Sequence, residues 1–231
     1  MIMLALRKPG LAEKIIRLIY PVKCMICGKV LTEDSVLYLC DSCHELLPRC
    51  ETGFHKTEKL PYINGIFSAF HYENGIDKAI QAMKFDYQPR LSETLSFILL
   101  EELLKETRIP HFDFIIPVPM HKKKMRSRGF NQSRLIADKI SEALQIPVDT
   151  EVLVKTRNTR PQSTLKKEER LNNLLDAFSV EYPERVINKN ILLVDDVITT
   201  GTTINSCGRI LYENGAEKIY AVVIANAEKC R

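Results

Sequence analysis

The segment Ile191–Thr203 constrains the fold of this chain more than any other part of it. Four consecutive apolar residues, Ile191–Val194, precede two acids, Asp195 and Asp196, and a run of threonines around Gly201. A fully apolar run of this length predicts a strand buried on both faces, as in a parallel sheet. Ligands of open α/β sheets bind outside the carboxyl ends of the strands. The polar residues that follow the apolar run are therefore candidate ligand contacts.

The residues after the two acids are suited to hold a phosphate group. Hydroxyl and amide groups of Thr199–Thr203 can surround an anion, and Gly201 lets the backbone approach it closely. A helix predicted over Thr203–Tyr212 adds a favourable dipole at its N-terminus. The segment has neither the lysine nor the spacing of a Walker P-loop. The two carboxylates can accept hydrogen bonds from ribose hydroxyls or hold Mg²⁺ through water.

Alternating strand and helix patterns predict an α/β domain built on a parallel sheet. Strands are expected at Tyr62–Tyr72, Phe114–Val118, Val152–Lys155, Ala177–Val180, Ile191–Val194 and Ile219–Ala225. Helices are expected at Gly75–Lys84, Leu91–Thr107, Asn131–Leu144, Leu165–Leu175 and Thr203–Tyr212.

The composition is that of a globular protein, with 45% hydrophobic and 27% charged residues. The 231 residues allow one sizeable α/β domain and a small module. No apolar run approaches the length of a membrane span, and the N-terminus lacks the pattern of a signal peptide. We expect a cytoplasmic protein. The net charge of +4 does not by itself indicate nucleic acid.

Four of the seven cysteines form two CxxC pairs at the spacing of a zinc ribbon. They are Cys24, Cys27, Cys40 and Cys43. Four thiolates close a tetrahedral site, so we expect structural zinc that helps to fold a module at residues 21–55. A redox dithiol and an iron–sulfur site are the alternatives, and the double CxxC favours zinc over both.

Residues 1–20 are predicted to contain an amphipathic helix, over Gly10–Tyr20. Such a helix can bind a membrane surface or a partner helix, or it can pack on its own domain. We favour packing on its own domain, because Lys14 and Arg17 alone supply positive charge in this stretch.

A basic loop is predicted directly after the strand Phe114–Val118. Its cations are Lys122, Lys123, Lys124, Arg126 and Arg128. A loop in this position can neutralise a pyrophosphate group or follow the backbone of a nucleic acid. The alternative is a solvated lysine-rich loop, which its location at the carboxyl end of a strand makes the weaker interpretation.

Several motifs together resemble the ComF family of late-competence proteins. The resemblance covers nearly all of the chain past Pro21 and is strongest in RGFNQ. Its parts, in chain order, are the four cysteines, Lys84-Phe85, Pro117–Pro119, Arg128–Gln132, Thr159–Gln162, Glu169–Asn173 and the segment Ile191–Thr203. Ser163 stands where the family often has a second glutamine, which makes the role of that small loop less secure.

The resemblance implies a type I phosphoribosyltransferase fold over residues 60–231, a parallel sheet flanked by helices, with a small N-terminal zinc ribbon. It implies that Asp195 and Asp196 bind the ribose hydroxyls of 5-phosphoribosyl-1-pyrophosphate (PRPP), with Mg²⁺. The expected PRPP-binding loop comprises Val197, Ile198, Thr199, Thr200, Gly201, Thr202 and Thr203.

The resemblance also implies a role in natural transformation, in which incoming single-stranded DNA is handled at the cytoplasmic side. A helicase-like competence protein is the expected partner. The resemblance is also compatible with peripheral association of the chain with the uptake machinery. Two hypotheses follow: a Mg²⁺-dependent phosphoribosyltransferase with an unknown acceptor, and a non-enzymatic DNA-binding module that uses PRPP or a phosphorylated DNA end as a ligand. In either case we expect residues upstream of Pro110 to cover the site.

Overall fold

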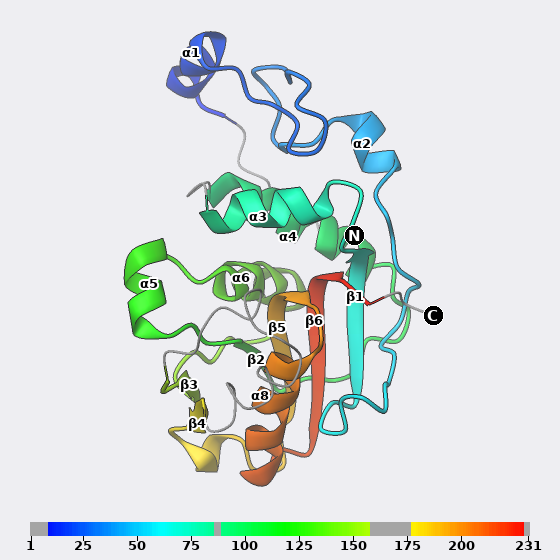
Figure 1. Cartoon of the computed structure of the whole chain (residues 1–231), viewed down its shortest axis with the longest axis vertical. Coiled ribbons are helices and arrows are strands. Elements are labelled where there is room, and N and C mark those ends of the chain that lie inside the picture. Colours follow the sequence, from blue (N-terminus) through cyan, green and yellow to red (C-terminus); the bar gives the residue numbers. More distant parts are fainter. Residues whose placement is uncertain (1–8, 86–88, 158–176, 229–231) are drawn as a thin grey trace.

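The computed structural model describes residues 9–85, 89–157 and 177–228 (Figure 1). Its main sheet has four parallel strands in the order β1-β6-β5-β2. These strands are β1 (Gly65–His71), β6 (Lys218–Asn226), β5 (Asn190–Ile198) and β2 (Phe114–Pro117). The parallel sheet predicted from the alternating sequence pattern is confirmed.

The strand that carries the two acids is longer than the sequence pattern predicted. We expected it to stop at Val194, but β5 continues to Ile198, because β6 runs beside it as far as Asn226. On the other side of β5, β2 ends at Pro117, opposite Val194. The two acids therefore lie just past the end of β2, at a step in the edge of the sheet.

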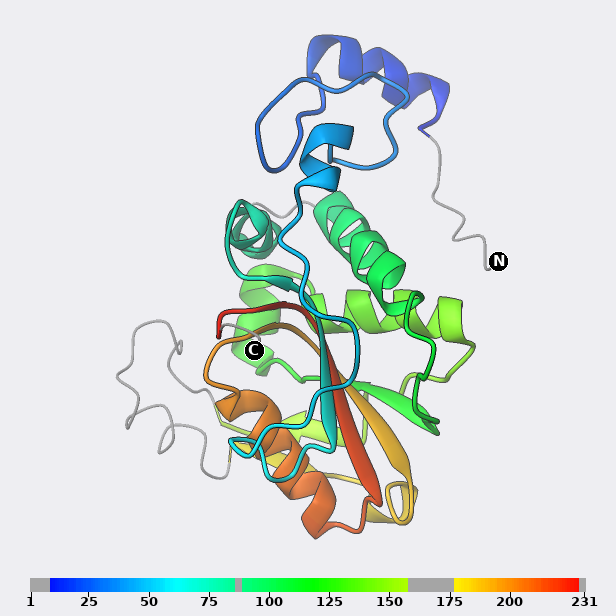
Figure 2. The same cartoon turned by 90° about the vertical axis from the view of Figure 1, so that its right-hand side faces the viewer.

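Helices cover both faces of the main sheet (Figures 1 and 2). One face packs against α3 (Ile76–Phe85), α4 (Pro89–Leu103) and α6 (Gln132–Leu144), and the other packs against α8 (Thr202–Glu213). Successive residues of β5 enter the two cores alternately: Leu192 packs into the first and Leu193 into the second. This three-layer arrangement places the carboxyl ends of the strands between helices.

Two short strands that the sequence predicted lie outside the main parallel sheet. They are β3 (Leu153–Lys155) and β4 (Phe178–Val180), and they pair with each other in antiparallel register. Leu153 and Phe178 extend the core on the α8 side. A short 3₁₀ helix, η2 (Pro183–Arg185), follows β4. The expected helix at Leu165–Leu175 lies outside the described residues.

A connecting segment, residues 49–60, runs along the free edge of β1. Arg49 forms an antiparallel bridge with Phe70, and His55 forms one with Ile66. The amide of Cys50 donates a hydrogen bond of 3.0 Å to the carbonyl of Ala69. The backbone groups of this edge strand are thus paired in part, and the segment is held against the sheet.

The cysteine-containing module lies at one end of the molecule, next to α3 and α4 (Figures 1 and 2). It contains α1 (Leu11–Ile19) and α2 (Asp41–Glu45). Several polar contacts join it to α4. The Tyr38 amide donates to Thr94 Oγ1 at 3.0 Å, His44 Nε2 lies 2.7 Å from Glu101, and two ion pairs join Arg49 to Glu102 and Arg90 of α4 to Glu13 of α1.

Helix α1 packs on its own module through its polar side. Arg17 is buried, and its guanidinium donates to Glu13 and to the carbonyls of Glu33 and Ser35 at 2.7–2.9 Å. Leu11 and Leu18 on the opposite side are 78% and 73% exposed. We expected a helix packed on its own domain, and the apolar side would ordinarily make that contact, yet here it faces outward. Within the described residues, no helix has the length and apolar character to cross a membrane.

Candidate functional site

The two carboxylates, hereafter the acidic pair, are held by hydrogen bonds from three different parts of the chain. Asp195 accepts from the hydroxyl of Ser133, at the start of α6, over 2.9 Å. The same oxygen accepts from the amide of Asp196 over 2.9 Å. Lys84, in the last turn of α3, places its ammonium group 2.7 Å from Asp196 Oδ2. The acidic pair is therefore oriented before any ligand binds.

Burial and mutual repulsion set the charge state of this pair. Burial raises the pKa of Asp195 to about 7, the negative charge of Asp196 acts in the same direction, and the hydrogen bond from Ser133 opposes both. Burial by itself lowers the pKa of Lys84, but the charges of Asp196 and Asp195 raise it overall above its ordinary value. Lys84 is thus a protonated counterion, and Asp195 exchanges a proton near neutral pH.

The threonine loop, residues 197–203, joins β5 to α8. Gly201 is the N-cap of α8, with φ of +71°, and as a glycine it places no side chain over the start of that helix. Hydroxyl groups of Thr200 and Thr202 lie 2.7 Å apart. The dipole and amides of a helix N-terminus favour an anion, and the loop adds threonine hydroxyl groups of the kind that bind phosphate.

The geometry divides the predicted loop residues into two groups. Ile198 is buried in the core on the α8 side, and Val197 packs against the other core. Their side chains point into the protein, and only their backbone groups face the loop. The exposed and half-buried threonines, Thr199, Thr200, Thr202 and Thr203, carry the polar side chains.

Gly201 is also required by packing. A Cβ atom at this position would lie 2.6 Å from Leu60 Cδ2, closer than such contacts occur in proteins. Leu60 belongs to the connecting segment and is buried. The threonine loop and the connecting segment therefore support each other directly.

The basic residues after β2 form a helix, which corrects the predicted loop. Helix α5 (Lys122–Arg128) begins at His121, whose Nδ1 accepts from the Lys123 amide over 3.2 Å, and it ends at Gly129, with φ of +81°. Arg128 is buried. The other four cations, Lys122, Lys123, Lys124 and Arg126, are exposed.

One cation of α5 is close enough to the acidic pair to interact with it. Although Lys124 is exposed as a whole residue, protein atoms around its ammonium group displace water and lower its pKa. Repulsion from Arg128 and Lys84 lowers this pKa further, whereas the charge of Asp196 acts in the opposite direction. Helix α5 therefore borders the site that contains the acidic pair.

Lys84 and Lys155 are site residues that we did not predict. Lys155 ends β3, and its ammonium group lies 5.2 Å from the centre of the Phe178 ring. Burial lowers the pKa of Lys155, and the negative charge of Asp195 opposes that shift. Lys84 belongs to the Lys84-Phe85 motif, which contributed to the family resemblance but did not indicate what Lys84 does in the site. Lys155 had no sequence signal, because a single lysine after a short strand is common.

The four predicted metal ligands, Cys24, Cys27, Cys40 and Cys43, are brought together. Their sulfur atoms all lie within 4.8 Å of one another, which can hold a metal ion. The Cys40 amide donates a hydrogen bond to the Cys24 sulfur over 3.5 Å, which would stabilise that sulfur as a thiolate. Four sulfur donors at this separation fit a tetrahedral thiolate site.

Neighbouring side chains with ligand capacity are engaged elsewhere. His44 Nε2 lies 2.7 Å from a carboxylate oxygen of Glu101, and His55 Nε2 lies 3.1 Å from the carbonyl of Thr52. The four-sulfur cluster belongs to the module that contains α1 and α2, which lies on the opposite side of α3 and α4 from the main sheet (Figure 1). Any metal held there serves the module rather than the chemistry at the sheet edge.

Comparisons with known proteins agree with this geometry. The model of the phosphoribosyl transferase domain matches residues 131–231. The DNA utilization protein YhgH of Shigella flexneri is 32% identical over 206 residues, which are 85% of this chain and 86% of that protein. Competence protein F of Haemophilus influenzae is 32% identical over 165 residues, 68% of this chain and 70% of that protein.

Among solved structures, the glutamine PRPP amidotransferase of B. subtilis overlaps 63% of this chain and 30% of its own, with a TM-score of 0.42 and 18% identity. That overlap is too partial to support an argument, so the fold class rests on the domain model and the strand order. The sheet, the acidic pair and the threonine loop define a protein with a type I phosphoribosyltransferase domain. The chain belongs to the ComF family, together with competence protein F and YhgH.

Proposed function

We propose that this chain binds PRPP with Mg²⁺ at the acidic pair and the threonine loop. The observation that carries the proposal is the convergence of a carboxylate pair, a helix N-terminus with a glycine cap and three lysines, Lys84, Lys124 and Lys155. The carboxylates are suited to ribose hydroxyls and the loop to the 5-phosphate. The lysines are suited to the negative charge of pyrophosphate.

The proposed reaction is transfer of the phosphoribosyl group to an acceptor. Positive charge develops on the sugar as its bond to pyrophosphate breaks, and the acidic pair lies where it can stabilise that charge. Mg²⁺ would neutralise pyrophosphate and would be held through water by the same carboxylates. Assays of pyrophosphate release with bases, nucleosides and single-stranded DNA test this reaction, and no release with any of them contradicts it.

We propose that the process served is DNA uptake during natural competence, in the cytoplasm. Relatives are named as a competence protein and as DNA utilization proteins, which supports this assignment. A helicase-like protein on the uptake path is the proposed partner. Loss of transformation after Asp196→Asn, at unchanged protein level, is the expected outcome in a naturally competent host.

A second candidate is non-enzymatic binding of single-stranded DNA, and the composition of α5 favours it. Lys122, Lys123 and Arg126 are exposed. Three exposed cations on one short helix can follow a phosphate backbone, and such binding weakens steeply with salt. Changing these three residues to alanine should reduce both DNA affinity and its salt dependence. Unchanged affinity would exclude α5 as the DNA-binding element.

Calorimetric titration with PRPP, with and without Mg²⁺, tests the proposal as a whole. We expect Mg²⁺-dependent binding that Asp195→Asn weakens at least tenfold. Asp138→Asn is the matched control, because Asp138 is a half-buried acid on α6 that pairs with Arg134 and not with the acidic pair. Equal binding by the wild type and Asp195→Asn would contradict the role of the acidic pair.

The division of the chain belongs to the same proposal. Residues 1–20 would carry the helix, residues 21–55 would form a zinc-holding module, and residues 60–231 would form the phosphoribosyltransferase-like domain. The cluster of four sulfur atoms supports zinc, which accepts four thiolates in tetrahedral geometry. Zinc would stabilise a module that has little core of its own.

A further inference from the structure

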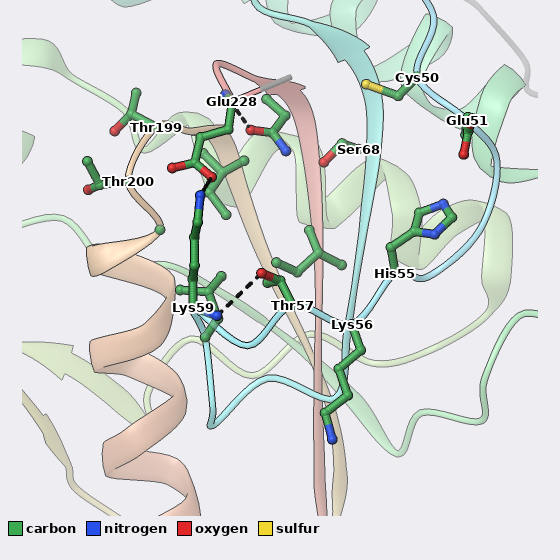
Figure 3. A pocket seen from close by; sticks show the side chains of 15 residues that line it. Cys50, Glu51, His55, Lys56, Thr57, Lys59, Ser68, Thr199, Thr200 and Glu228 are labelled. Carbon is green, nitrogen blue, oxygen red and sulfur yellow. Dashed lines mark hydrogen bonds and ion pairs between the residues drawn. The ribbon is translucent and has the colours of Figure 1, made fainter. Parts of the chain in front are cut away.

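The two halves of the proposed PRPP site differ in what a ligand meets there. Thr199, Thr200 and Gly201 of the threonine loop line a cavity of about 550 Å³ (Figure 3). Among the described residues that line this cavity there is neither Asp195 nor Asp196. Asp196 is instead engaged by Lys84, whose ammonium group lies 2.7 Å from its Oδ2 atom. A ligand of the loop meets a cavity, whereas a ligand of Asp196 Oδ2 must compete with Lys84.

Burial makes the contact between Lys84 and Asp196 costly to break. Both side chains are largely buried, and the contact joins α3 to β5. A buried carboxylate that loses its counterion keeps an uncompensated charge, which is strongly unfavourable. The same holds for a buried ammonium group. Asp196 therefore releases Lys84 readily only to a ligand that satisfies both groups.

The charges around this contact prepare the Lys84 ammonium group for an anion. Asp196 attracts it most strongly among the neighbouring charges, and Asp195 adds a weaker attraction. Lys124 of α5 lies close enough to repel it. An anion placed between these two lysines would attract both and would relieve their repulsion. The ammonium group thus has a favourable second partner once an anion enters.

The chemistry of PRPP supplies both of the required partners on neighbouring atoms. Its sugar hydroxyls can donate to the Asp196 carboxylate. The anomeric carbon, which is bonded to the carbon of one of these hydroxyls, carries the pyrophosphate group. Ribose 5-phosphate has the same hydroxyls and the same 5-phosphate but no anion at the anomeric carbon. Because its 5-phosphate is directed to the threonine loop, it offers Lys84 no replacement for Asp196.

We propose that Lys84 is a specificity-determining residue that exchanges partners: it pairs with Asp196 until PRPP binds, and then passes to the pyrophosphate group. The inference rests on the proposed binding of PRPP and deepens it by naming the residue that selects PRPP over ribose 5-phosphate. Lysine suits this role, because its ammonium group is a point charge with three donors on a flexible stem. A ligand without the second anion binds against the ion pair, and specificity follows from that penalty.

Calorimetric titrations with PRPP and with ribose 5-phosphate, at one concentration of Mg²⁺, test the exchange. Lys84→Met removes the charge and retains an unbranched side chain, and Lys84→Gln is the second uncharged variant, should Lys84→Met fail to fold. Lys84→Arg retains the charge. Lys78→Met, at an exposed position of the same helix, is the matched control. Circular dichroism verifies that each variant is folded.

We expect the wild type to bind PRPP at least tenfold more tightly than ribose 5-phosphate. In the uncharged variants ribose 5-phosphate should bind at least threefold more tightly than it does to the wild type, because it no longer competes with an ammonium group. The preference for PRPP should fall at least tenfold. Lys84→Arg should retain most of this preference, and Lys78→Met should match the wild type.

The affinity for ribose 5-phosphate decides between an exchange and a fixed contact. A lysine that only contacts pyrophosphate leaves that affinity unchanged when it is removed, and loss of a positive charge by itself weakens the binding of an anion. Unchanged or weaker binding of ribose 5-phosphate by the uncharged variants therefore overturns the proposal. The same changes in Lys78→Met, or an equal loss of preference in Lys84→Arg, also overturn it. If PRPP does not bind to the wild type, the proposed function fails instead.

Discussion

Lys84 and Asp196 form an ion pair of 2.7 Å that joins the last turn of α3 to the acidic pair. The Lys84 side chain is 24% exposed and that of Asp196 is 10% exposed, so water screens the pair weakly. Lys84 therefore offsets part of the negative charge of the acidic pair. Helix α3 therefore takes part in the site although it precedes the phosphoribosyl transferase match.

Replacing Lys84 by methionine should destabilise the protein, because a largely buried carboxylate loses its partner. The free energy of unfolding should fall by about 1–3 kcal/mol at neutral pH. Lys78→Met, on the exposed side of the same helix, should change it by less than about 0.5 kcal/mol. Urea unfolding measures both, and adding Asp196→Asn to Lys84→Met should recover part of the loss. Equal effects at both lysines would contradict this account.

Asp195→Asn should stabilise the protein at alkaline pH. The pKa of Asp195 is raised to about 7 in the folded state, so between about pH 4 and 7 the folded protein holds a proton that the unfolded chain has released. Stability from this group therefore falls as pH rises through that window and is lowest above pH 7. The variant lacks this loss, and its advantage should grow by on the order of 2 kcal/mol between pH 5 and 8. Thermal unfolding across pH measures it; a constant difference would contradict the raised pKa.

Ser133→Ala should shift the pH dependence of PRPP binding upward. The hydrogen bond from Ser133 lowers the pKa of Asp195, and its removal should raise that pKa further. Affinity for Mg²⁺ and PRPP should rise with pH as Asp195 ionises, with its midpoint up to about one unit higher in the variant. Ser141→Ala, near the other end of α6, is the control. Calorimetry from pH 6 to 8 supplies the midpoints, and coincident midpoints would refute the link.

Gly201→Ala should cost more than Gly129→Ala, although both glycines have positive φ. A Cβ at Gly129 has no heavy atom within 4 Å, whereas at Gly201 it meets Leu60 at 2.6 Å. We expect a loss of about 1 kcal/mol at Gly129 from backbone strain alone and at least about 2 kcal/mol at Gly201. Leu60→Ala should cost less in the Gly201→Ala background than in the wild type. Chemical unfolding of the four variants decides; equal losses at the two glycines would mean that Leu60 yields freely.

Metal analysis should find one zinc ion per chain. Cys27→Ser removes one of the four clustered thiols and should lower the zinc content sharply and destabilise the module. Cys50→Ser, outside the cluster, should retain the metal. Elemental analysis with thermal unfolding in the presence of a chelator provides both readouts. Purified wild type that carries iron, or no metal at all, would contradict a structural zinc site.

The parts of the site that sequence predicted are those whose signal is local. The apolar run, the two acids and the threonines lie within the strand, loop and helix start that they form, so their spacing alone predicts a ligand site. The cysteines likewise lie close in the chain, and the structure clusters them. The parallel sheet followed from the alternation of strand and helix patterns.

Sequence could not predict the parts that depend on contacts between distant segments. Lys84 and Lys155 reach the acidic pair only because α3 and the pair β3-β4 pack on opposite faces of the sheet. Helix α5 has no apolar periodicity, and its ends are set by the His121 cap and Gly129. The extension of β5 depends on β6 beside it, since backbone pairing outweighs the low strand propensity of aspartate.

The connecting segment has a consequence for any shortened form of this protein. Residues 49–55 pair with part of the backbone of β1. A chain that began at Leu60 would therefore expose the unpaired backbone edge of β1, a strand whose residues are mostly buried. Such an edge is a template on which another chain can add a strand. Removing the cysteine module together with this segment would thus favour self-association, and residues 49–55 act as a safeguard against aggregation.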